Sequence, residues 1–199
     1  MTHTACTASE TQASPFAVSW QKLMMWIFIV GDGLLFAGFL ASYGFARLAS
    51  PFWPHQSEVF SLSFISLMTF VLISSSATMA SAVGAAQRGN SPAVVRYVAL
   101  TALGGAIFLG MQALEWTEFI HDGARLYTNP WNVPQFSAFF FLITGFHGTH
   151  VLSGVAILLI AMVRQMKHKA TPGGIELVGL YWHFVDLVWV FIFTLFYLL

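Results

Sequence analysis

The stretch that decides the fold runs from Phe136 to Val163 and reads FSAFFFLITGFHGTHVLSGVAILLIAMV. It contains no Lys, Arg, Asp or Glu, and it is longer than the about 20 helical residues that cross a bilayer core of about 30 Å. A run of this kind predicts a transmembrane helix. The alternation of apolar and polar residues that marks the strands of a membrane barrel is absent, so the fold class is all-α membrane protein.

Comparable apolar runs recur along the chain, and short breaks with Pro, Gly or charge separate them. The 199 residues are 57% hydrophobic and only 8% charged, whereas about a quarter of the residues of a soluble domain are charged. Residues 1–19 are rich in Thr, Ser and Ala and contain no Lys or Arg, which predicts a disordered tail and not a signal peptide. The sequence predicts one domain over 20–199, a five-helix transmembrane bundle with spans at about 23–46, 59–86, 94–118, 136–163 and 176–199.

The positions of Lys and Arg predict the orientation, because these residues gather on the cytoplasmic side of membrane proteins. Most of the eight lie at one end of the predicted spans, and only Arg47 and Arg125 lie at the other. We therefore expect a cytoplasmic N-terminus and a C-terminus on the outer side. The inner basic residues are also candidates for contact with anionic lipid head groups; these are Arg88, Arg96, Arg164, Lys167 and Lys169. A net charge of zero gives no indication of a nucleic-acid partner.

Several ionisable or amide side chains lie inside the predicted spans, where each is costly and needs a reason. Except for Asp32, they come in pairs three residues apart, which places both members on one helix face. Counting about 1.5 Å per residue places Asp32, His147 and Asp186 near the middle of the membrane, and His150 and His183 nearer the cytoplasm. The candidate site residues are Asp32, Gln112, Glu115, His147, His150, His183 and Asp186.

Three roles are open for these residues. The favoured role is hydrogen bonding between helices, because polar side chains in a membrane usually pair with each other. Three His and two carboxylates could bind iron or zinc, but no Glu-x-x-His pair occurs among these candidate residues, and one cysteine cannot form a thiolate zinc site. The third role, a proton or ion path, is less favoured because no Pro breaks a span at mid-depth and no inverted repeat is visible. We expect neither a catalytic residue nor a metal site in this chain.

Four segments of the chain carry a recognisable pattern: TGFHGTHV at 144–151, YWHFVDLVW at 181–189, QALEW at 112–116 and WIFIVGD at 26–32. Together they resemble subunit III of the haem-copper respiratory oxidases. The last is similar to the helix that carries the family's buried carboxylate. Asp32 stands where the cytochrome c branch commonly has Glu, and Asp also occurs there in the quinol branch. The chain lacks the first two of the seven spans that many members have, as short bacterial forms do.

The resemblance implies a non-redox, accessory subunit III of an aa3-type cytochrome c oxidase, which reduces O2 to water and pumps protons across the bacterial inner membrane. Haem and copper would belong to partner subunits, with subunit I as the main contact and subunit II and a small subunit IV as further partners. Bound phospholipid, support of proton uptake and protection of the active site are also implied. The alternatives are a quinol oxidase or nitric-oxide-reductase-associated subunit and, in another class, an independent transporter or channel.

Overall fold

The computed structural model describes residues 19–199, so nearly all of the tail predicted over 1–19 lies outside the described residues. Five long helices make up the fold: α1 (Trp20–Ala49), α3 (Leu62–Gln87), α4 (Ser91–His121), α5 (Pro134–Met166) and α6 (Pro172–Ile192), which continues into the π-helical turn η1 (Phe193–Leu198). All five are long and apolar enough to cross a membrane. The predicted all-α fold with five candidate spans is confirmed, while the orientation stays a prediction.

Three of the long helices begin where a side chain caps free backbone N–H groups. The side chains of Ser19, Asn90 and Thr171 accept hydrogen bonds from the backbone at the starts of α1, α4 and α6, as N-cap residues do. The second long helix begins at Leu62 and not at Val59, because α2 (Gln56–Val59) forms a separate short helix before it. Local capping thus accounts for the starts of α1, α4 and α6, which hydropathy alone does not locate.

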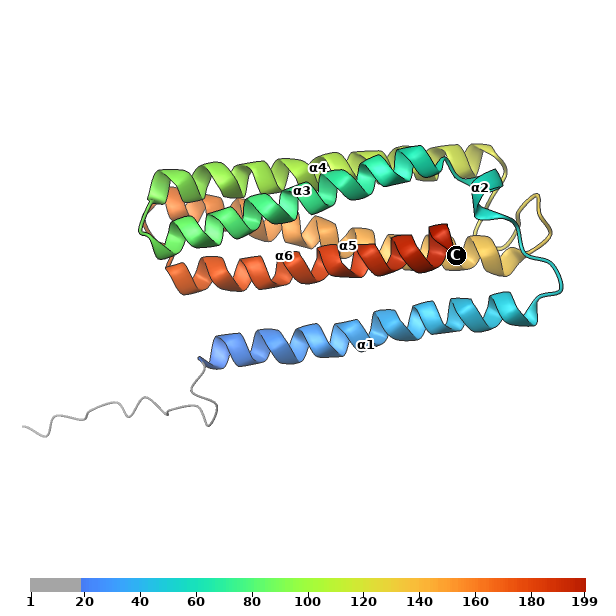
Figure 1. The fold of residues 1–199 in the computed structure, drawn as a ribbon, viewed down its shortest axis with the longest axis horizontal. Coiled ribbons are helices and arrows are strands. Elements are labelled where there is room, and N and C mark those ends of the chain that lie inside the picture. The colour runs from blue at the N-terminus through green and yellow to red at the C-terminus, as the bar shows by residue number, and fades with distance from the viewer. Residues whose placement is uncertain (1–18) are drawn as a thin grey trace, which may run out of the picture.

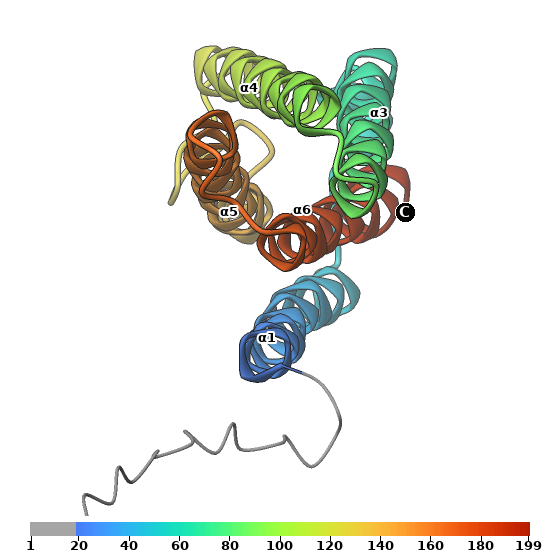
Figure 2. The same ribbon diagram turned by 90° about the vertical axis from the view of Figure 1, so that its left-hand side faces the viewer.

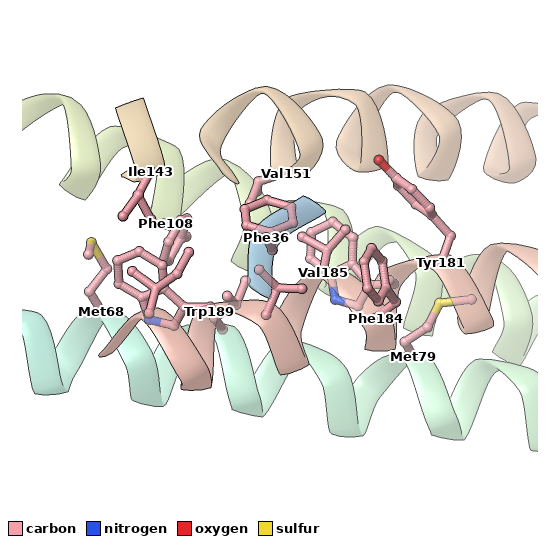
Figure 3. Close-up of a cluster of buried hydrophobic side chains, with 14 of the residues drawn as sticks. Phe36, Met68, Met79, Phe108, Ile143, Val151, Tyr181, Phe184, Val185 and Trp189 are labelled. Atoms are coloured by element: carbon pink, nitrogen blue, oxygen red, sulfur yellow. The ribbon is translucent and has the colours of Figure 1, made fainter. Parts of the chain in front are cut away.

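Helices α3 to α6 form a four-helix bundle, and α1 lies outside it (Figure 1, Figure 2). Within the bundle, α3 and α5 each pack against both α4 and α6. Helix α1 packs chiefly against α6 and α5, and only Phe36 and Tyr43 of its side chains are buried. Phe36 reaches the cluster of buried apolar side chains that the bundle helices supply (Figure 3).

The bundle core centres on Trp182 of α6, which is 1% exposed. Its ring occupies space that two glycines leave open, since a Cβ added to Gly154 of α5 would lie 2.9 Å from its Cζ3 and one added to Gly105 of α4 would lie 3.1 Å from its Cζ2. Its indole N–H donates to Ser75 Oγ of α3 at 3.1 Å. One side chain of α6 therefore contacts all three other helices of the bundle.

Aromatic packing holds the C-terminal end of α1. The ring centroid of Tyr43 lies 4.6 Å from that of Phe196 in η1 and 5.6 Å from that of Trp53. Its hydroxyl accepts a hydrogen bond from Gln56 Nε2 of α2 at 3.1 Å. The short helix α2 and the turn η1 thus anchor α1 beyond the bundle.

Candidate functional site

The contact between α1 and α5 joins two of the predicted site residues. Asp32 Oδ2 lies 3.3 Å from His150 Nε2, and the two side chains are 11% and 14% exposed. His150 Nδ1 lies 2.9 Å from the carbonyl oxygen of Phe146, so Nδ1 carries a proton, because a carbonyl only accepts. With Nδ1 protonated, a neutral imidazole has only a lone pair at Nε2, and a carboxylate oxygen also has only lone pairs. A favourable contact therefore requires one proton between His150 Nε2 and Asp32 Oδ2. The two atoms are in contact without the alignment of a hydrogen bond.

A second polar contact joins α6 to α3. His183 Nδ1 lies 2.6 Å from Ser76 Oγ. Asp186, one turn along α6, is buried, and its Oδ1 has no hydrogen-bond partner among the described residues. The pair His183/Asp186 therefore faces α3, but only its histidine makes a hydrogen bond to that helix.

Helices α4 and α5 are joined through Thr144. Gln112 Nε2 donates to its carbonyl oxygen at 2.6 Å, and Trp116 Nε1 donates to its hydroxyl at 3.1 Å. Both donors fit because α5 has glycines opposite them. A Cβ added to Gly148 would lie 2.9 Å from Gln112 Oε1, and one added to Gly145 would lie 3.0 Å from Trp116 Cη2. The small residues of α5 thus make room for the hydrogen bonds between α4 and α5.

Two predicted site residues are buried and make no hydrogen bond of normal geometry through their side chains. Glu115 is 5% exposed and His147 is 0% exposed. Within the described part of the chain, neither carboxylate oxygen of Glu115 and neither ring nitrogen of His147 has a hydrogen-bond partner. The His147 ring instead packs with its centroid 5.1 Å from that of Trp189 and 5.7 Å from that of Phe108. The structure does not join these two residues to the paired ones through any hydrogen bond.

The basic residues predicted to contact lipid gather at one end of the bundle. The turn between α3 and α4 and the turn between α5 and α6 lie together there (Figure 1), and a hydrogen bond of 2.8 Å from Gln165 Nε2 to Ser91 Oγ links them. The exposed basic side chains at this end are Arg88, Arg96, Arg164, Lys167 and Lys169. Among the side chains that the structure describes, no group of three or more His, Cys, Asp or Glu has the arrangement of a metal site.

Sequence reasoning missed the hydroxyl partners that α3 supplies to α6. Trp189 Nε1 donates to Thr69 Oγ1 at 3.0 Å. Trp182, seven residues earlier on α6, makes the equivalent hydrogen bond to Ser75 of α3. Two Trp residues seven apart on one helix point to one side, and Thr69 and Ser75 are nearly as far apart on α3. This matched spacing was the available signal.

Known proteins match the chain over nearly its whole length. The protein-family model for cytochrome c oxidase subunit III matches residues 8–199. Quinol oxidase subunit 3 of Bacillus spizizenii is 34% identical over 180 residues, which cover 89% of this chain and 86% of that protein. Cytochrome c oxidase subunit 3 of Corynebacterium diphtheriae is 34% identical over 177 residues, covering 86% and 84%. Cytochrome bo(3) ubiquinol oxidase subunit 3 of Pseudomonas putida is 33% identical over 183 residues, covering 89% and 84%.

The match extends through all five long helices and includes the four motifs quoted above. These relatives are all third subunits of haem-copper oxidases, although they differ in the electron donor that their names give. The chain therefore belongs to the cytochrome c oxidase subunit III family, as its motifs predict, and is a subunit of a terminal oxidase complex.

Proposed function

We propose that this chain is the non-redox accessory subunit III of an aa3-type cytochrome c oxidase in the bacterial inner membrane. It packs on subunit I, with subunit II and a small subunit IV as further partners. Its rigid bundle gives subunit I a fixed neighbouring surface, which keeps proton uptake fast and protects the active site during turnover. The chain itself carries no catalytic residue.

The observation that supports this role is how the polar side chains inside the spans are used. Asp32 contacts His150 between α1 and α5, and Ser76 contacts His183 between α3 and α6. Gln112 binds the α5 backbone from α4. A transporter needs its polar groups to line one water-filled path, whereas these groups are spread over three different helix contacts. This arrangement favours a support protein over an independent transporter or channel.

The exposed basic side chains at one end of the bundle extend the proposal to lipid. Arg88 lies in the α3–α4 turn, Arg96 lies in the second turn of α4, and Arg164 lies in the last turn of α5. No ion pair engages these three side chains in the described part of the chain. Basic clusters at the membrane surface attract anionic phospholipid, so we assign head groups of the inner leaflet to this end.

A quinol donor is the second candidate, because relatives named for quinol oxidases and for cytochrome c oxidases reach the same 34% identity. Asp32 adds to this candidate, since it resembles the residue of the quinol branch. The two candidates differ only in the partner subunits that accept electrons, and not in the role of this chain.

The test is purification of the complex in mild detergent through a tag on this chain. We expect a reduced-minus-oxidised spectrum with haem a bands, and oxygen uptake when reduced cytochrome c is added. Uptake with quinol and none with cytochrome c would replace the donor and keep the subunit role. A colourless chain that purifies alone and stays folded would contradict the proposed function.

A further inference from the structure

The contact between α3 and α6 places polar side chains at the outside of the bundle, deep in the membrane. Ser76 lies eleven residues before the end of α3 at Gln87, and His183 lies eleven residues after the start of α6 at Pro172. Both side chains are therefore about 16 Å from the end of the bundle that carries the basic turns. Because a hydrocarbon core is about 30 Å thick, both lie well inside it.

The imidazole of His183 is only half-buried, and the chain uses only one of its nitrogens. Nδ1 makes the contact of 2.6 Å with Ser76 Oγ. Nε2 has no hydrogen-bond partner in the described part of the chain and is not among the atoms that this part fully encloses, so it faces the surroundings of the bundle. A neutral imidazole has one donor and one acceptor nitrogen, so Nε2 needs a partner in either tautomer.

Asp186 extends the polar character of this face by one turn of α6. It lies three residues after His183 and on the same side of the helix, and it is 9% exposed. Its Oδ1 is enclosed without a hydrogen-bond partner among the described residues. Lipid tails around such a face would leave Nε2 of His183 unpaired, which is costly because hydrocarbon contains no donor, acceptor or water.

The α3 side of the same face suits the close approach of another helix. Ala80 is exposed and follows Ser76 by four residues, so both lie on one side of α3. Small side chains at this spacing let two helix backbones come close together in a membrane. Ile73, three residues before Ser76, is 47% exposed and adds an apolar contact. Helix α1 packs on α6 and α5, and Figure 2 shows that it leaves the outer side of α3 uncovered.

We propose that the α3–α6 face formed by Ser76, Ala80 and His183 docks a transmembrane helix of a partner subunit, which hydrogen-bonds to His183 Nε2 through a Ser, Thr, Asn or Gln side chain. These side chains both donate and accept, so they match either tautomer, and they are the usual hydrogen-bonding groups between membrane helices. The proposal rests on the proposed function only in that partner subunits surround the chain. It adds the face of the bundle and the chemistry of the contact.

The test places the photoreactive amino acid benzoylphenylalanine at Ile73, irradiates intact membranes and then purifies the tagged chain. Ile107 of α4 is the matched control position, because it is 45% exposed and lies at a similar depth in the membrane. Each probe is combined with three changes. His183→Phe removes both ring nitrogens, His183→Gln keeps a group that donates and accepts, and Ser76→Ala removes only the contact within the chain. Mass spectrometry identifies the cross-linked peptides, and haem per tagged chain is measured after washing in detergent.

We expect the probe at Ile73 to cross-link to a transmembrane peptide of another oxidase subunit. This cross-link and the retained haem should fall several-fold in His183→Phe and change little in His183→Gln and Ser76→Ala, while labelling from Ile107 stays the same in all variants. Labelling of lipid alone or of a second copy of this chain from Ile73 would overturn the proposal, as would a cross-link that His183→Phe leaves unchanged or lowers equally at Ile107. Haem content reports the proposed function separately. A colourless preparation contradicts that function, while cross-linking in the membranes still decides whether the α3–α6 face meets a partner helix or lipid.

Discussion

Adding a single methyl group at Gly105 should loosen the whole bundle. A Cβ at this position would lie 2.7 Å from Val155 Cγ2 of α5 and 3.1 Å from Trp182 Cζ2 of α6, and real Cβ atoms do not approach other carbons as closely as the first distance. The indole cannot turn away cheaply, because its N–H is bound to Ser75 and its ring also fills the space above Gly154. Gly105→Ala must therefore push two helices away from α4.

The magnitude follows from two opposing effects. Overpacking a well-packed core costs about 1–3 kcal/mol, while replacing Gly by Ala in a helix gains about 1 kcal/mol from propensity. Gly110, also in α4, has no atom within 4 Å of an added Cβ, so Gly110→Ala carries the propensity gain alone. We expect Gly105→Ala to unfold about 1–3 kcal/mol more easily than Gly110→Ala.

The assay is unfolding by SDS in mixed micelles, followed by the far-ultraviolet circular dichroism of the purified chain. A double-mutant cycle with Trp182→Phe identifies the cause, since the smaller ring leaves room for the new methyl group. The two changes together should destabilise the chain by about 1 kcal/mol less than the sum of the single changes. Equal stability of Gly105→Ala and Gly110→Ala would refute the proposed steric clash at Gly105. Strictly additive effects with Trp182→Phe would refute the part of Trp182 in it.

Three further changes test individual contacts. Asp32→Leu removes the partner of His150 and should lower the amount of haem that co-purifies with the tagged chain, whereas Asp32→Asn keeps a donor for Nε2 and should retain most of it; equal retention in both would show that the contact does not hold α1. Thr69→Val leaves the indole N–H of Trp189 without an acceptor and should cost about 1–3 kcal/mol in SDS unfolding, while Thr69→Ser should cost less. Lys22→Gln breaks an ion pair whose side chains are 36% and 40% exposed, so it should change unfolding by at most about 1 kcal/mol, and a larger loss would mean that this pair is better shielded from water than its exposure indicates.

The helices were predictable because hydropathy needs no knowledge of neighbours. A run such as 136–163 must become a helix in a bilayer, since its backbone N–H and C=O groups find no partners in lipid. The short helix α2 was not predictable in this way, because Gln56–Val59 is neither long nor periodic. Its place depends on contacts such as the bond from Gln56 to Tyr43, which joins parts of the chain on different elements.

The polar contacts were only partly predictable. Residue counting gives the depth of a side chain, and it grouped Asp32 with His147 and Asp186, whereas the structure places Asp32 against His150. Depth does not fix which neighbour a helix has or how the helix is rotated, and α1 sits outside the bundle, where it meets α5 and α6. His147, three residues before His150, points into the aromatic core. Equal spacing therefore gave two histidines with different surroundings.

Helix α1 differs in physical character from the rest of the chain. It is held by the exposed ion pair of Lys22 with Glu176, by the contact of Asp32 with His150, and by the packing of Phe36 and Tyr43. Apolar cavities of about 570 Å³ and 500 Å³ lie beside it between these points. A helix with so little burial gains little stability from its own chain, so we expect the partner subunits of the complex to supply the rest. Changes in α1 should therefore impair assembly of the complex before they unfold the protein, whereas changes at the glycines around Trp182 should act in the opposite order.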